Sequence, residues 1–115
     1  MIALIDRIPI CPHGTKEDIN VSLLVTLERL EESLGFDLPF TSGFRCPECN
    51  KKAGGKENSA HLVGKAVDIA CKTSFVRYQM LYHFFLAGID RIGIGKGFLH
   101  VDISIDLPRN VTWLY

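Results

Sequence analysis

The feature that most constrains the fold is a pair of short apolar segments with ionisable side chains at alternate positions. Residues 65–70 read Lys-Ala-Val-Asp-Ile-Ala, and residues 98–103 read Phe-Leu-His-Val-Asp-Ile. A β-strand sends successive side chains to opposite faces. The Asp68 side chain therefore lies on the strand face opposite to Val67 and Ile69. The His100 side chain lies on the same face as Asp102. If the two strands pair, Asp68 and His100 converge.

A third ionisable residue, His61, lies seven residues before Asp68, and Gly64 between them allows the chain to turn back. Ionisable groups among apolar residues are costly unless they are paired or bound to metal. Two imidazoles and one carboxylate, with a fourth position open, match a catalytic zinc centre rather than a closed structural one. We predict one zinc ion held by His61, Asp68 and His100. The alternative is that the buried histidine and aspartate side chains satisfy one another.

Three segments of the chain carry a resemblance to a known family. They are TSGFR at residues 41–45, SAHLVGKAVDI at residues 59–69, and RIGIG running into FLHVD within residues 91–102. Together they resemble the zinc D-alanyl-D-alanine carboxypeptidases, which belong with the hedgehog-type and lysostaphin-type metallopeptidases. That group includes bacterial cell-wall carboxypeptidases and phage endolysins. The resemblance covers the chain from Leu38 onward.

This resemblance implies a function. We expect a zinc-dependent peptidase that hydrolyses peptidoglycan stem-peptide bonds, as a D-Ala-D-Ala carboxypeptidase or a related endopeptidase, through attack of a zinc-bound water. Arg45 stands where the family has an arginine that contacts the substrate, so we expect it to be catalytic and substrate-binding; the alternative is an ion pair with Glu48 or Glu57. The family pattern also assigns Ser59 to the substrate, although it could instead cap the turn that holds His61.

The carboxylate that shuttles the proton is where this chain departs from much of the family. Many relatives carry a glutamate three residues before the last histidine ligand, where this chain has Gly97. Asp102 and Glu57 are the remaining candidates, and we expect Asp102 to be catalytic. Asp102 could instead orient a metal ligand. The missing glutamate keeps open a non-catalytic zinc-containing binding module of the same fold.

The cysteines are a separate feature. Cys46 and Cys49 have zinc-knuckle or redox spacing, and Cys11 with His13 could complete a structural four-ligand site. Because Cys11 and His13 are closer together than such half-sites usually are, we expect these cysteines and Cys71 to be mostly buried thiols. A cysteine-based structural zinc protein is the alternative.

Composition limits the partners. A chain of 115 residues can form one domain with a single core, here residues 1–115. The 13 Lys and Arg residues balance the 13 Asp and Glu residues, which argues against a general nucleic-acid surface. No apolar run reaches membrane-spanning length. We expect a monomer whose partners are peptidoglycan stem peptides, with neither nucleic acid nor membrane among them.

The beginning of the chain lacks the basic segment, long apolar stretch and small-residue cleavage site of a signal peptide. We therefore expect synthesis in the cytoplasm and action on the cell wall after release, in a bacterium or a phage.

Hydrophobic periodicity and turn residues predict the order of the elements. We expect a helix from Thr15 to Leu34, begun by a capping pair of Thr15 and Asp18 or by Asn20, and ended by Gly35. The other elements are strands at 38–42, 65–70, 91–95, 98–104 and 111–115, and helices at 46–53 and 75–86. The aromatic stripe of the last helix is expected to be core. This order predicts an α+β, hedgehog/DD-peptidase-like single domain with a small, mainly antiparallel sheet and flanking helices.

Overall fold

The structure is a computed structural model that describes residues 3–115. Met1 and Ile2, the first residues of the segment that lacks signal-peptide character, lie outside the described residues. In chain order, the elements are α1 (Leu4–Arg7), the 3₁₀ turn η1 (Lys16–Asp18), α2 (Val21–Leu34), β1 (Phe40–Ser42), α3 (Pro47–Lys52), the 3₁₀ turn η2 (Ala60–Val63), β2 (Ala66–Ala70), α4 (Ser74–Leu86), β3 (Arg91–Gly95), β4 (Phe98–Asp102) and β5 (Val111–Leu114).

The strands form one sheet in the order β1-β2-β4-β3-β5. Every neighbouring pair is antiparallel except β3 and β5, which are parallel. A two-residue turn joins β3 to β4, and Gly97 in that turn has a φ of 91°, a backbone conformation that favours glycine. The predicted α+β fold, with a mainly antiparallel sheet and flanking helices, is confirmed.

Helix α2 ends at Leu34 as predicted, but it begins at Val21 rather than at Thr15. Asn20 caps it by accepting a hydrogen bond from the Leu23 N–H, and Gly35 ends it in the left-handed conformation. The Thr15 and Asp18 pair also forms a capping box, but around the preceding turn η1. Both predicted capping signals are therefore used, by two consecutive elements.

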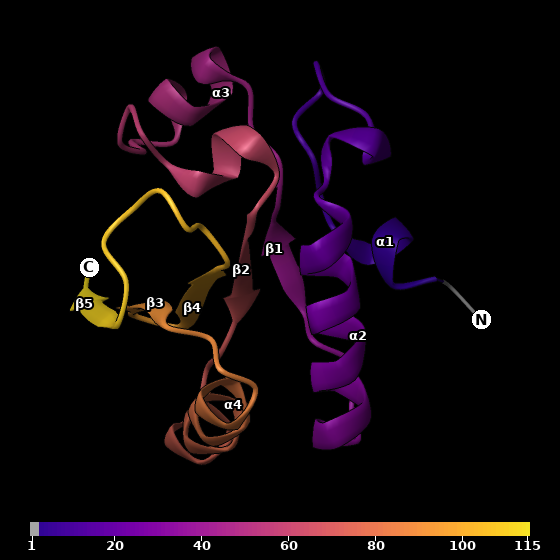
Figure 1. Ribbon diagram of the computed structural model, residues 1–115, viewed down its shortest axis with the longest axis vertical. Helices are drawn as coiled ribbons and strands as arrows, with labels where there is room; N and C mark the ends of the chain where they lie inside the picture. Colours follow the sequence, from indigo (N-terminus) through magenta and orange to yellow (C-terminus); the bar gives the residue numbers. More distant parts are fainter. Residues whose placement is uncertain (1–2) are drawn as a thin grey trace.

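The core lies between the helices and one face of the sheet. Leu23, Leu27 and Leu30 of α2 and Met80 and Phe84 of α4 belong to one buried cluster together with apolar side chains of β2, β3 and β4. Figure 1 shows α3 and η2 at the end of the molecule opposite to α4.

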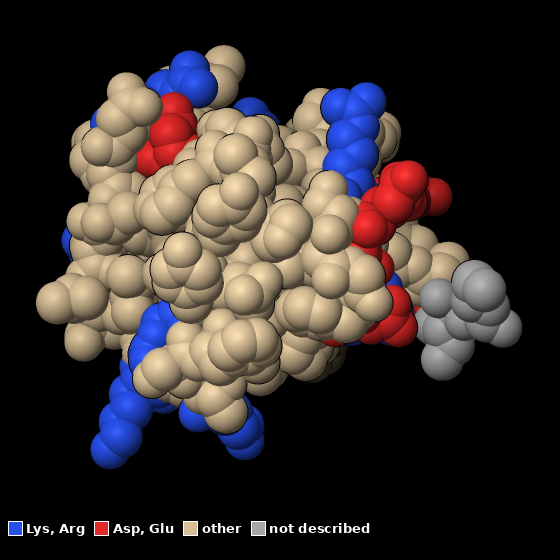
Figure 2. Space-filling view, turned by 90° about the horizontal axis from the view of Figure 1, so that it is seen from below, with Lys and Arg blue, Asp and Glu red and all other residues tan. Residues whose placement is uncertain are grey.

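The aromatic face of α4 differs from the prediction. Met80 and Phe84 are buried, but the side chains expected to form a core stripe are mostly exposed, at 73% for Phe75, 67% for Tyr78 and 56% for Phe85. Figure 2 views the molecule from the end at which α4 lies, and the charged residues in that view lie mainly around the margin. The helix is apolar on most of its surface, so its sequence did not determine which side faces the sheet.

The structure contains no helix within residues 3–115 that combines the length and apolar character needed to cross a membrane.

Candidate metal centre

Asp68 and His100 stand opposite each other on the polar face of the sheet. β2 and β4 pair in a register that places Asp68 against His100 and Val67 against Val101. Val67 and Val101 are buried in the core, so the side chains of Asp68 and His100 project from the opposite face of the sheet. The convergence of these two residues, expected if their strands paired, is confirmed.

His61 reaches the same place from η2. The Ser59 Oγ accepts a hydrogen bond from the His61 N–H and caps this turn, and Gly64 ends it in the left-handed conformation. A Cβ at Gly64 would lie 1.8 Å from the carbonyl oxygen of Asp18. Glycine is therefore required both by the backbone conformation and by the close approach of the chain.

The three side chains offer ligand atoms at short mutual distances. The Asp68 Oδ1 lies 3.4 Å from the His61 Nε2 and 3.2 Å from the His100 Nδ1, and all three ligand atoms lie within 4.8 Å of one another. A tetrahedral zinc ion with bonds of about 2.0–2.1 Å separates its nitrogen and oxygen ligands by roughly 3.3 Å. The spacing fits such an ion.

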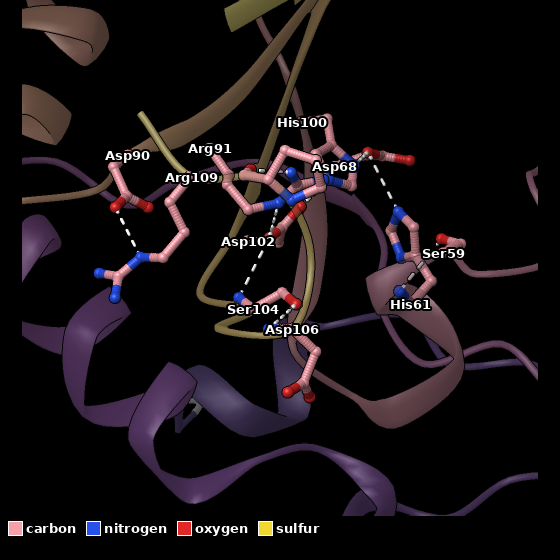
Figure 3. Close-up of polar contacts among 11 residues, drawn as sticks. Ser59, His61, Asp68, Asp90, Arg91, His100, Asp102, Ser104, Asp106 and Arg109 are labelled. Carbon is pink, nitrogen blue, oxygen red and sulfur yellow. Dashed lines mark hydrogen bonds and ion pairs between the residues drawn. The ribbon is translucent and has the colours of Figure 1, made fainter. Parts of the chain in front are cut away.

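Figure 3 shows one nitrogen of His61 facing Asp68. The other nitrogen of each imidazole is held by the protein. The His61 Nδ1 lies 2.7 Å from the Gly43 carbonyl oxygen, and the His100 Nε2 lies 2.7 Å from the Asp102 Oδ2. With these nitrogens as donors, a bound metal would take the nitrogen of each ring that faces Asp68. The buried His61 Nε2 has no hydrogen-bond partner within the described residues. This is the arrangement expected of histidines that bind a metal.

Opposite charges in the site stabilise one another's ionised forms. Burial alone would raise the pKa of Asp68, but its contacts with His100 and His61 outweigh this effect and hold that pKa well below its usual range. Burial would lower the pKa of His100, but Asp102 and Asp68 on either side of the ring raise it above its ordinary value. The metal-free centre is therefore a cluster of opposite charges.

Asp102 is enclosed behind His100. Its side chain is buried, and its Oδ1 accepts hydrogen bonds from the Arg91 Nε at 2.7 Å and the Ser104 N–H at 3.1 Å. Burial would raise the pKa of Asp102, but its contacts with His100 and Arg91 lower it. Both carboxylate oxygens are thus engaged, one with Arg91 and Ser104 and the other with His100.

The predicted substrate residues lie close to the cluster along the backbone. The Arg45 N–H donates to the His61 carbonyl oxygen at 3.1 Å. The Arg45 Nε is buried without a hydrogen-bond partner among residues 3–115, and Arg45 forms no ion pair with Glu48 or Glu57 there. Burial raises the pKa of Tyr115, although a hydrogen bond with Trp113 acts in the opposite direction. Glu57 is exposed on the loop before η2.

The contacts of Trp113 with His100 and of Arg91 with Asp102 were not predicted from the sequence. Gly93 pairs with His100 on one side and Trp113 on the other. A Cβ at Gly93 would lie 2.7 Å from the Trp113 Nε1, so the glycine lets the indole pack over the strand, with its ring 5.3 Å from that of His100. Arg91, which holds Asp102, also lies against the Trp113 ring. A glycine inside a strand was the available signal for this close approach.

The cysteines differ in part from their prediction. Cys11 and Cys71 are buried, but Cys46 and Cys49 are only half-buried. Cys11, Cys46 and Cys49 lie together with His13, in a second group whose ligand atoms are all within 4.8 Å of one another. Cys71 lies outside this group.

Comparison with known proteins gives a family for the chain. The model of the family described as Peptidase M15 matches residues 6–102, which is most of the sequence. No curated protein matches the chain.

Proposed function

Because the chain belongs to the peptidase M15 family, we propose that it is a zinc peptidase that hydrolyses peptidoglycan stem-peptide bonds, as a D-Ala-D-Ala carboxypeptidase or a related endopeptidase. Membership of the family makes the protein a metallopeptidase. One observation carries the proposal further. Each of two histidines donates one ring N–H to a protein oxygen and turns its other nitrogen toward Asp68.

His61, Asp68 and His100 would hold the zinc ion. Bound there, zinc would lower the pKa of a water ligand toward roughly 7 and polarise a peptide carbonyl. Three protein ligands leave a fourth coordination position open, as in catalytic rather than structural zinc sites.

Arg45 is proposed to bind the substrate. Its buried Nε lacks a hydrogen-bond partner within the described part of the chain, and a buried N–H without a partner is costly. A carboxylate or carbonyl of a stem peptide would supply the missing partner. Ser59 is proposed to assist, because its Oγ accepts from the His61 N–H and still has a hydroxyl proton to donate.

Asp102 is proposed to orient His100 rather than to carry a proton. Its two oxygens are occupied by Arg91, Ser104 and His100, and only 1% of its surface is exposed. A proton carrier must reach the leaving group, directly or through one water. Glu57, on the exposed loop before η2, is the other candidate for this task.

A second candidate function is a zinc-containing binding module without turnover. The enclosure of Asp102 and the presence of Gly97 where many relatives have a glutamate favour it, because neither position supplies a free carboxylate.

The test is zinc content measured together with muropeptide hydrolysis, with the released products identified by mass spectrometry. We expect the wild type to hold zinc and to release D-alanine or a cleaved stem peptide. His61→Ala and Asp68→Ala should each lose the zinc ion of this centre together with hydrolysis. His83→Ala is the matched control, because this histidine belongs to α4 and should retain both.

The outcomes separate the two candidate functions. Zinc that binds and is lost in His61→Ala, without any cleavage by the wild type, would establish the binding module. Zinc at this centre that persists in both His61→Ala and Asp68→Ala would overturn the ligand assignment. If cleavage occurs, its loss in Glu57→Gln with zinc retained would identify Glu57 as the proton carrier.

A further inference from the structure

We propose that Cys11, His13, Cys46 and Cys49 bind a structural zinc ion, separate from the centre at His61, which fastens the segment before α2 to the beginning of α3. The inference does not depend on the proposed peptidase activity. It rests on the geometry of four soft ligands that come from two distant parts of the chain.

The ligand atoms have the spacing of a zinc site. The His13 Nδ1 lies 3.4 Å from the Cys46 Sγ and 3.4 Å from the Cys49 Sγ, and all four ligand atoms lie within 4.8 Å of one another. With zinc–sulfur bonds of about 2.3 Å and zinc–nitrogen bonds of about 2.0 Å, a tetrahedral ion separates sulfur from nitrogen by roughly 3.5 Å. Little movement would be needed to close the four atoms around an ion.

Backbone amides already point at two of the sulfur atoms. The Cys46 N–H donates to the Cys11 Sγ at 3.3 Å, and the Cys49 N–H donates to the Cys46 Sγ at 3.5 Å. Such hydrogen bonds favour the thiolate, which is the form that binds metals. All four cysteines of the chain are free thiols. Three free thiols and one imidazole are therefore positioned to bind a single cation.

The fold overcomes the short spacing between Cys11 and His13 that argued against this site in the sequence. The Gly14 N–H donates to the Cys11 carbonyl oxygen, which closes a turn around His13. The Cys11 N–H donates to the Phe44 carbonyl oxygen, and a Cβ at Gly14 would lie 2.5 Å from the Phe44 ring. The turn therefore packs against Phe44, two residues before Cys46. This contact brings Cys11 and His13 close to Cys46 and Cys49.

Four protein ligands close the site, so its role is structural rather than catalytic. Three thiolates and an imidazole favour zinc over harder divalent cations. The site directly follows Arg45 in the chain, and the Arg45 N–H and the Gly43 carbonyl both hydrogen-bond to His61. A zinc ion here would therefore stiffen the segment that positions His61 and Arg45.

The experiment measures zinc per chain for protein purified under reducing conditions. In the variant with His61→Ala and Asp68→Ala, which removes ligands of the other centre, we expect one zinc ion to remain. Adding Cys46→Ser and Cys49→Ser should remove that ion. Adding Cys71→Ala instead is the matched control, because this cysteine lies outside the group, and it should leave the ion in place.

A second measurement covers the case in which the cysteine variants do not fold. Cobalt replaces zinc in the His61→Ala, Asp68→Ala variant, whose cysteines are intact, and thiolate ligation produces an intense ligand-to-metal charge-transfer band in the near ultraviolet. We expect this band, and its loss in His13→Ala or a marked change in its shape. Absence of both the band and the remaining zinc would overturn the proposal. So would a Cys46–Cys49 disulfide found in the freshly purified protein.

Discussion

The His100 Nε2 lies 2.7 Å from the Asp102 Oδ2, two residues further along the same strand. The other oxygen of Asp102 is held by the Arg91 Nε from the neighbouring strand β3. Because Arg91 holds the Asp102 carboxylate in place, Asp102 fixes both the ring orientation of His100 and the ring nitrogen that carries the proton. The proposed metal ligand therefore depends on a residue that does not face the metal.

Replacement of Asp102 by asparagine should weaken zinc binding at this centre. Loss of a carboxylate that orients a histidine ligand costs roughly 10–100-fold in metal affinity. Competition with a chelator measures this affinity, and thermal unfolding checks that the variant folds. Asp106→Asn, at an exposed position two residues beyond the buried Ser104, is the control and should have no effect. Unchanged affinity with lost hydrolysis would instead make Asp102 the proton carrier that the sequence predicted.

Trp113 should report metal binding at the His61 centre. It is the only tryptophan of the sequence, and its ring centroid lies 5.3 Å from that of His100. A cation that binds His100 changes the charge beside the indole, so we expect the tryptophan emission of metal-free protein to change when zinc is added. The change should disappear in His61→Ala and persist in Cys46→Ser. An equal response in His61→Ala would show that the emission reports another site.

Two adjacent phenylalanines of α4 should differ sharply in their effect on stability. Phe84 is fully buried, and Phe85 is 56% exposed. Phe84→Ala should lower the free energy of unfolding by about 3–5 kcal/mol through lost burial and a cavity. Phe85→Ala should change it by about 0.5 kcal/mol or less. Urea unfolding measures both, and a large effect of Phe85→Ala would show that its side of the helix is covered in solution.

Two glycines with similar backbone conformations should tolerate alanine differently. Gly54 and Gly64 have φ values of 76° and 68°, but a Cβ at Gly54 meets nothing within 4 Å, whereas one at Gly64 would meet the Asp18 carbonyl oxygen at 1.8 Å. Gly54→Ala should lower the free energy of unfolding by about 1 kcal/mol, because alanine is less stable than glycine in the left-handed conformation. Gly64→Ala should cost clearly more, and should also weaken zinc binding by displacing η2. Equal destabilisation of the two variants in urea unfolding would refute this account.

Several features could be predicted from the sequence because they depend on local chemistry. The alternation of apolar and ionisable residues placed Asp68 and His100 on one face, since side chains repeat every two residues along a strand. Asn20 and Gly35 marked the ends of α2 because capping needs particular side chains and a left-handed residue. His61 was associated with them because Gly64 allows a turn and because two imidazoles and a carboxylate match a zinc site, and the structure brings the three together.

Other features were decided only by the tertiary structure. The contacts of Arg91 with Asp102 and of Trp113 with His100 depend on the strand order and on the parallel pairing of β5 with β3. The face of α4 that packs inward could not be read from a helix that is apolar on most sides. The cysteine group depends on the direction in which the loop at residues 11–14 turns. In each case residues far apart in sequence meet, and neither spacing nor composition specifies which of many possible encounters the packed core selects.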